Sequence, residues 1–111
     1  MPYGSVKNQA GNFVKASLES VTAAAAEVAH NMPADFRVSI TNAPGEKAYP
    51  ISSFTWLLVP ARFDDKNKLK VMKDLLQWVV TDGQKMTQEL LSAPLPEEVV
   101  AKEQAAFNKV Q

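Results

Sequence analysis

The fold is decided by residues 51–59, which read ISSFTWLLV. Successive side chains of a β-strand point to opposite faces of the sheet, so Phe54 and Trp56 would share one face. Leu57 and Val59 would lie on the other face, and both faces are therefore largely apolar. A strand of this kind is usually covered on both sides. We expect it to need flanking strands and a layer of helix above and below.

Upstream of this strand, the pattern predicts a helix, a second strand and a turn. Ser17 can cap a helix that runs to about Asn31, because Pro33 cannot continue one. The polar residues before that helix would form an extended lead-in. Residues 36–40 alternate apolar and polar side chains, which is the period of a strand. Residues 42–50 contain two prolines and a glycine, so they predict a connection and the best internal boundary.

Downstream, the pattern predicts helices only. After a charged linker, an amphipathic helix carries an apolar stripe made of Leu69, Met72, Leu75, Leu76 and Val79. Thr81 and Gln84 have the spacing of a capping box, which predicts a further helix to about Leu91. Pro96 suits the first position of a last helix, whose inner face would hold Val99.

Composition excludes several classes of protein. The 111 residues fit one domain, and 46% hydrophobic with 22% charged residues is typical of a globular chain. Twelve basic residues balance twelve acidic ones, so we expect neither nucleic acid nor an anionic membrane as a partner. Without cysteine, disulfides, thiolate metal sites and thiol catalysis are excluded. No apolar run could span a bilayer, and the N-terminus has no secretory-signal pattern.

Candidate catalytic and metal-binding residues are few. The single histidine, His30, is expected to rest against the negative end of its helix rather than to act as a base. The carboxylate pairs at 64–65 and 97–98 both precede helices, where negative charge is favoured. No metal-ligand or phosphate-loop spacing occurs. We therefore assign no catalytic residue, no metal site and no cofactor.

Two hydroxyl-rich features could bind an anion. Residues 52–55 enter the central strand, and residues 81–83 precede a helix whose free N–H groups attract negative charge. The stronger interpretation is that these hydroxyls satisfy local backbone groups, and Asp82 would repel an anion. Trp56 and Trp78 lie in apolar patterns, so we expect both in the core rather than on a ligand platform.

Four blocks carry a family resemblance: 11–20 (GNFVKASLES), 49–59 (YPISSFTWLLV), 78–85 (WVVTDGQK) and 93–96 (APLP). In this order and spacing they resemble the C-terminal third of the periplasmic phosphate-binding protein of bacterial phosphate ABC transporters. The match runs from about Pro2 to Val110.

The resemblance implies a helix-rich α/β fragment of a two-lobed periplasmic-binding-protein fold, with two or three strands and a periplasmic location. Residues 1–48 resemble the tail of the second lobe, and residues 49–111 resemble the closing part of the first. In that family the phosphate ligands are an N-terminal Thr-Phe loop, serine, aspartate and arginine residues, and a Ser-Gly-Thr helix start. All lie upstream of the matched region, so no phosphate-binding residue can be carried over.

These observations lead to a non-enzymatic, truncated phosphate-binding-protein-like segment that does not bind phosphate alone. Since neither lobe is complete, we expect a homo-oligomer, formed by domain swapping through the linker at 42–50, or a complex with a complementary fragment. The alternative is an autonomous oligomerising structural or interaction module without solute binding. A third interpretation is a small enzyme, and only His30 and scattered carboxylates support it.

Overall fold

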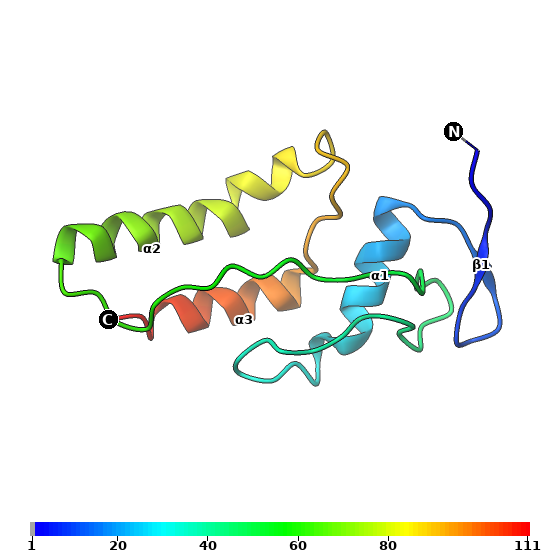
Figure 1. Ribbon diagram of the computed structural model, residues 1–111, viewed down its shortest axis with the longest axis horizontal. Helices are drawn as coiled ribbons and strands as arrows, with labels where there is room; N and C mark the ends of the chain where they lie inside the picture. The colour runs from blue at the N-terminus through cyan, green and yellow to red at the C-terminus, as the bar shows by residue number, and fades with distance from the viewer. Residues whose placement is uncertain (1) are drawn as a thin grey trace.

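The structure, a computed structural model, describes residues 2–111. In chain order its elements are β1 (Val6–Lys7), β2 (Phe13–Val14), α1 (Leu18–Ala29), α2 (Lys66–Val80), the 3-10 helix η1 (Asp82–Met86) and α3 (Glu97–Phe107). These helices and the two short strands confirm the helix-rich α/β class expected from the sequence. In Figure 1, α2 and α3 lie side by side, α1 packs near the N-terminal end of α3, and the β1–β2 hairpin lies at the far end.

The helices begin where the sequence predicts. Ser17 Oγ accepts a hydrogen bond from the Ser20 amide at 3.1 Å, and Ser20 Oγ accepts one from the Ser17 amide at 3.0 Å. This capping box starts α1, which ends within two residues of the expected position, at Ala29. Asp65 caps α2 by accepting from the two amides that follow. Pro96 is the N-cap of α3 rather than its first residue, so the helix begins one residue later than expected, at Glu97.

The strand predicted at residues 36–40 is absent from the structure, where local turns replace it. Phe36 has a φ of 60°, a left-handed conformation that a strand does not contain. The Arg37 amide donates to Asp35 Oδ1, and the Val38 amide donates back to the Phe36 carbonyl. These short-range hydrogen bonds satisfy the backbone where a strand would use a neighbouring chain segment.

The central strand prediction at 51–59 is also wrong for the part of the chain described here. The segment is extended and runs alongside α3 (Figure 1), but it forms no ladder with residues 36–40. A single side-chain bond crosses between them near the middle, from Trp56 Nε1 to the Phe36 carbonyl at 3.2 Å. Leu58 is 96% exposed. The apolar faces that motivated the prediction are therefore only partly covered within residues 2–111: Phe54 packs against the core cluster, whereas Leu57 and Leu58 are exposed.

The only strand pairing among residues 2–111 is a hairpin in the expected lead-in, where Val6 pairs with Val14 and Lys7 with Phe13. Buried Asn8 fastens this hairpin to the rest of the chain. Its Nδ2 donates to the carbonyls of residues 45, 46 and 48 at 2.9–3.2 Å, and its Oδ1 accepts from the Asn12 amide. No local sequence pattern predicts this contact, because its partners lie about forty residues apart.

The predicted helix from Thr81 to Leu91 is a short 3-10 helix followed by turns. Thr81 Oγ1 donates to the Gln77 carbonyl at 2.7 Å instead of capping. Gln84 spans two segments, since its Nε2 donates to Val79 and its Oε1 accepts from the Leu95 amide. Both side chains of the expected capping box are thus committed elsewhere. The turn ends at Leu91, whose φ is 55°.

The core is small and built mainly from alanines. Its main cluster joins α1 to the 40–48 segment and consists of Ala24, Ala25, Ile40, Ala43 and Ala48, with Val28 and Phe54 packed against it. Leu76, Val80 and Val99 are buried where α2 meets α3. Trp56 and Trp78 are 50% and 47% exposed, so placing them in the core was wrong.

The molecule is thin and elongated, with principal extents of 50 × 29 × 18 Å. Its radius of gyration is 15.8 Å, whereas a compact chain of this length should have about 13 Å. One layer of helices with a chain segment laid along it has too little thickness to bury large side chains from every element. This shape explains why so many apolar residues remain exposed.

Candidate functional site

The main candidate site is an open groove of about 940 Å³ beside the 51–59 segment. Residues 53–59 form one wall, residues 35–40 another, and side chains of α2 and α3 form the floor. Its aromatic lining residues are Phe36, Phe54, Trp56 and Phe107. Phe54 and Trp56 meet edge to face, with ring centroids 6.2 Å apart. The groove is therefore apolar over most of its length.

The backbone of the groove wall is the unusual feature. Within residues 2–111, no backbone N–H from Ile51 to Val59 donates a hydrogen bond to the protein. The carbonyl of Ser52 accepts from Thr41 Oγ1, and that of Phe54 accepts from Ser53 Oγ. A row of free donors beside apolar side chains is the chemistry of an open sheet edge.

Glu103 is the acidic residue that α3 contributes to the groove. Burial raises the pKa of its carboxyl above the ordinary value of 4.5. No ion pair with Glu103 occurs among the described residues, although Arg37 lines the same groove. The carboxyl is thus a half-buried, unpaired group at an otherwise apolar surface.

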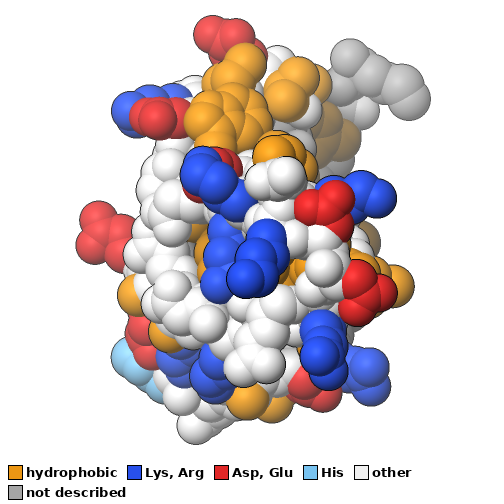
Figure 2. Space-filling model, turned by 90° about the vertical axis from the view of Figure 1, so that its left-hand side faces the viewer, with side chains coloured by type: hydrophobic (Ala, Val, Ile, Leu, Met, Phe, Trp, Pro, Cys, Tyr) orange, Lys and Arg blue, Asp and Glu red, His pale blue; other side chains and the backbone are white. Residues whose placement is uncertain are grey.

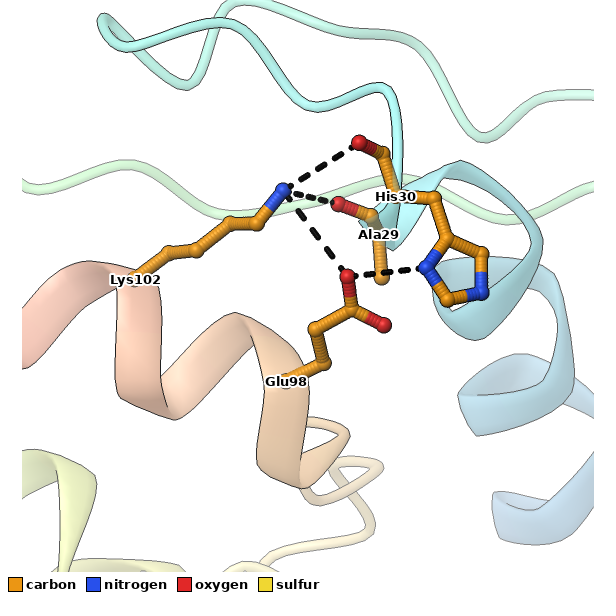
Figure 3. Close-up of polar contacts among 4 residues, drawn as sticks. All are labelled: Ala29, His30, Glu98 and Lys102. Carbon is orange, nitrogen blue, oxygen red and sulfur yellow. Dashed lines mark hydrogen bonds and ion pairs between the residues drawn. The ribbon is translucent and has the colours of Figure 1, made fainter.

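His30 lies at the C-terminal end of α1, as expected, and joins a polar cluster rather than a catalytic arrangement (Figure 3). Its Nδ1 lies 3.0 Å from Glu98 Oε1. Lys102 Nζ donates to the carbonyls of Ala29 and His30 at 2.5 and 3.4 Å, and lies 3.9 Å from Glu98 Oε1. The cluster ties α3 to the end of α1. No nucleophile takes part in these contacts.

Three of the four paired carboxylates lie at helix N-termini: Asp65, Glu97 and Glu98. Asp65 Oδ1 accepts from the amides of Asn67 and Lys68 at 2.7 and 3.3 Å. Glu97 and Glu98 lie in the first turn of α3, where the positive end of the helix favours them. Among residues 2–111, no three His, Asp or Glu side chains gather in a way that could hold a metal ion.

Both hydroxyl-rich features are occupied by local hydrogen bonds. Ser52 Oγ donates to the Tyr49 carbonyl at 2.7 Å, and Ser53 Oγ donates to the Phe54 carbonyl at 3.2 Å. At the second feature, Asp82 pairs with Lys85 at 2.6 Å, a contact that raises the pKa of the lysine. The structure therefore does not bring these groups together around an anion.

The surface charges are mixed in sign. Figure 2 looks onto the end of the molecule where α2 begins, and basic and acidic side chains are interspersed there with a hydrophobic patch above them. This face has no single-sign patch of the size that a nucleic acid requires. No helix in the described part of the chain has the length and apolar character needed to cross a bilayer.

Comparison with known proteins relates the chain to phosphate-binding proteins. The chain is 38% identical over 100 residues to a phosphate-binding protein PstS of Xylella fastidiosa, a match that covers 90% of this chain. The chain is related to a segment of PstS. This finding confirms the resemblance read from the sequence. Other PstS relatives come from Pasteurella multocida (32% over 96% of the chain) and Methanocaldococcus jannaschii (38% over 77%).

The match covers only part of each PstS. The chain spans 28% of the length of the Xylella protein, 31% of the Pasteurella protein and 24% of the Methanocaldococcus protein. No protein-family model matches the sequence. Homology therefore relates this chain to a segment of phosphate-binding proteins. It does not by itself assign the activity of a whole PstS to the chain.

Proposed function

We propose that this chain is a non-enzymatic structural segment of the PstS kind, related to periplasmic phosphate transport, that does not bind phosphate tightly by itself. The observation that carries the proposal is the 38% identity to PstS over 90% of the chain. Within the two-lobed fold that the resemblance implies, residues 1–48 would belong to the end of the second lobe. Residues 49–111 would belong to the closing part of the first.

The absence of tight phosphate binding follows from the hydroxyl groups available. A receptor holds phosphate with several convergent donors, commonly charged or at a helix N-terminus. Here Ser52 and Ser53 donate to neighbouring carbonyls, and Thr81 donates back into α2. The short helix η1 that follows Thr81 carries Asp82 at its start, a charge that opposes an anion.

A second candidate function is favoured by the exposed apolar surface beside residues 51–59. An autonomous oligomerising module, or half of a complex with a complementary fragment, would cover that surface. The exposure of Leu57 and Leu58 supports association of this kind. The two candidates are compatible, because a PstS-like segment can associate without taking up solute.

Isothermal titration calorimetry of inorganic phosphate into the purified chain tests the proposal. We expect no saturable heat at micromolar phosphate. A variant with Ser52, Ser53 and Thr81 replaced by alanine serves as the matched control and should give the same trace. Saturable one-to-one binding that this variant loses would overturn the proposal and locate a phosphate site on those hydroxyls.

A further inference from the structure

One carboxylate in the groove has no counter-charge. The groove is lined by three charged side chains, those of Asp35, Arg37 and Glu103. Arg37 Nε lies 3.7 Å from Asp35 Oδ2, so these two charges offset each other. Lys102, which precedes Glu103 on α3, donates instead to the Ala29 carbonyl at the end of α1. Glu103 therefore carries the uncompensated charge of the groove.

The surroundings of this carboxylate are apolar but open. Glu103 lies four residues before Phe107 on α3, so the two side chains share one helix face, and both line the groove. Burial raises the pKa of the Glu103 carboxyl above its ordinary value of 4.5. Among the buried and half-buried residues of 2–111, no side-chain N or O atom is both sealed from solvent and without a hydrogen-bond partner. An incoming cation can therefore reach the carboxylate, and pairing there would offset the cost of its burial.

The wall of the groove offers backbone donors to an extended chain. No N–H from Ile51 to Val59 donates a hydrogen bond within residues 2–111. The segment is held beyond both ends, by the Asn42 amide on the Pro50 carbonyl and by the Gln111 amide on the Ala61 carbonyl. An added strand binds such an edge through main-chain hydrogen bonds, and its side chains give the specificity. Free donors and a lone charge thus lie in the same groove.

The edge does not supply its own counter-charge. Residues 51–59 contain no Lys and no Arg, so the same segment of a second copy would leave Glu103 unpaired. The chain spans 28% of the length of the Xylella PstS, and most of that protein therefore lies outside the matched segment. A strand from that part, with a basic side chain directed at α3, would satisfy both the free amides and the carboxylate.

We infer that the groove takes up an extended strand with one Lys or Arg opposite Glu103, supplied by a part of a PstS-type protein that this chain does not span. The strand pairs with residues 51–59 through main-chain hydrogen bonds, and its basic side chain reaches the carboxylate on α3. This inference rests on the proposed function, and it gives the complementary fragment named there a defined contact and a defined charge.

Binding to immobilised peptides provides the first test. The probes are overlapping synthetic peptides that cover the Xylella PstS outside the matched segment, together with a peptide of residues 51–59. The folded chain should bind peptides that have alternating apolar residues and a Lys or Arg, and it should not bind the 51–59 peptide. Glu103→Gln should weaken binding by about tenfold. The matched control is Glu89→Gln, because Glu89 is exposed and lies outside the groove, and this variant should bind as the wild type does.

Exchange of the charges tests the contact itself. Replacing the basic residue of a bound peptide by Glu should abolish its binding to the wild-type chain. Glu103→Lys should reverse the preference, so that the Glu peptide binds about tenfold more tightly than the original. Circular dichroism checks that Glu103→Lys is folded. If it is not, the comparison of wild type with Glu103→Gln, which keeps the shape of the side chain, decides the outcome.

Three results would overturn the inference. The first is that no peptide binds above background, and the second is that Glu103→Gln binds the same peptides as tightly as the wild type. The third is binding of the 51–59 peptide in preference to all others, which would assign the edge to a second copy. None of these results bears on the calorimetric test with phosphate. Conversely, saturable phosphate binding would overturn the proposed function and leave the peptide measurements as they are.

Discussion

Lys102 Nζ donates a 2.5 Å hydrogen bond to the carbonyl oxygen of Ala29 and thereby closes the C-terminal end of α1 with a side chain from α3. The last carbonyls of a helix have no intrahelical partner, and a cation near them is favourable. α1 has no basic residue in its own last turn. The charge is supplied instead by a helix far along the chain (Figure 3).

The first prediction concerns this contact. Lys102→Met keeps most of the apolar stem and removes the charge, so the free energy of unfolding should fall by about 1–2 kcal/mol. Urea denaturation followed by circular dichroism measures the change. Lys70→Met is the control, because its ion pair with Asp74 is exposed on both sides and should matter by less than about 0.5 kcal/mol. Equal losses in both variants would contradict this role for Lys102.

The second prediction concerns Asn8. Asn8→Ala removes the donor shared by three carbonyls of the 42–50 linker and the acceptor of the Asn12 amide. The expected loss of stability is about 1–3 kcal/mol, because buried polar groups are left unpaired. Asn12→Ala, which removes one exposed hydrogen bond to Glu46, should cost less than about 1 kcal/mol. Denaturation midpoints that rank the two variants in the opposite order would refute the anchoring role.

The third prediction concerns the pH dependence that Glu103 confers. Burial raises the pKa of its carboxyl in the folded state, so the folded chain binds more protons than the unfolded chain between pH 4.5 and that raised value. The stability from this group is fully present below the unfolded pKa and is lost as the pH rises through the folded pKa.

Glu103→Gln should remove that decline and leave the protein more stable than wild type at neutral pH. Urea midpoints measured from pH 4 to pH 8 provide the comparison. Glu89→Gln, at an exposed position, should keep the wild-type pH profile. An unchanged pH profile in Glu103→Gln would show that this carboxyl does not carry the effect.

The sequence predicted the elements whose determinants are local. Ser17 and Asp65 start their helices by bonding amides two or three residues ahead, and such spacing is visible in a sequence. The stripe predicted on α2 was correct for Leu76, which is buried, and for Leu69, Met72 and Val79, which are half-buried. It was wrong for Leu75, which is 49% exposed. Helix faces follow a fixed period, so their inward side can be read without knowing what they pack against.

Contacts between distant segments were beyond the sequence analysis. The alternation at 36–40 indicates a strand, but a strand needs a bonded neighbour, and the turn at Phe36 is favoured without one. Asn8 bonds carbonyls some forty residues away, and Lys102 bonds one still farther. Trp56 was placed in a core that the thin fold does not build. The groove could not be predicted from the sequence either, because it forms only where α2 and α3 pack beside residues 53–59.

The central claim is that residues 51–59 form an extended segment whose backbone amides have no acceptor within residues 2–111. Hydrogen–deuterium exchange at those amides tests it most directly. The account predicts fast exchange there and much slower exchange at the amides of α2, which are bonded within the helix. Exchange at residues 51–59 that is as slow as exchange in α2 would contradict the claim.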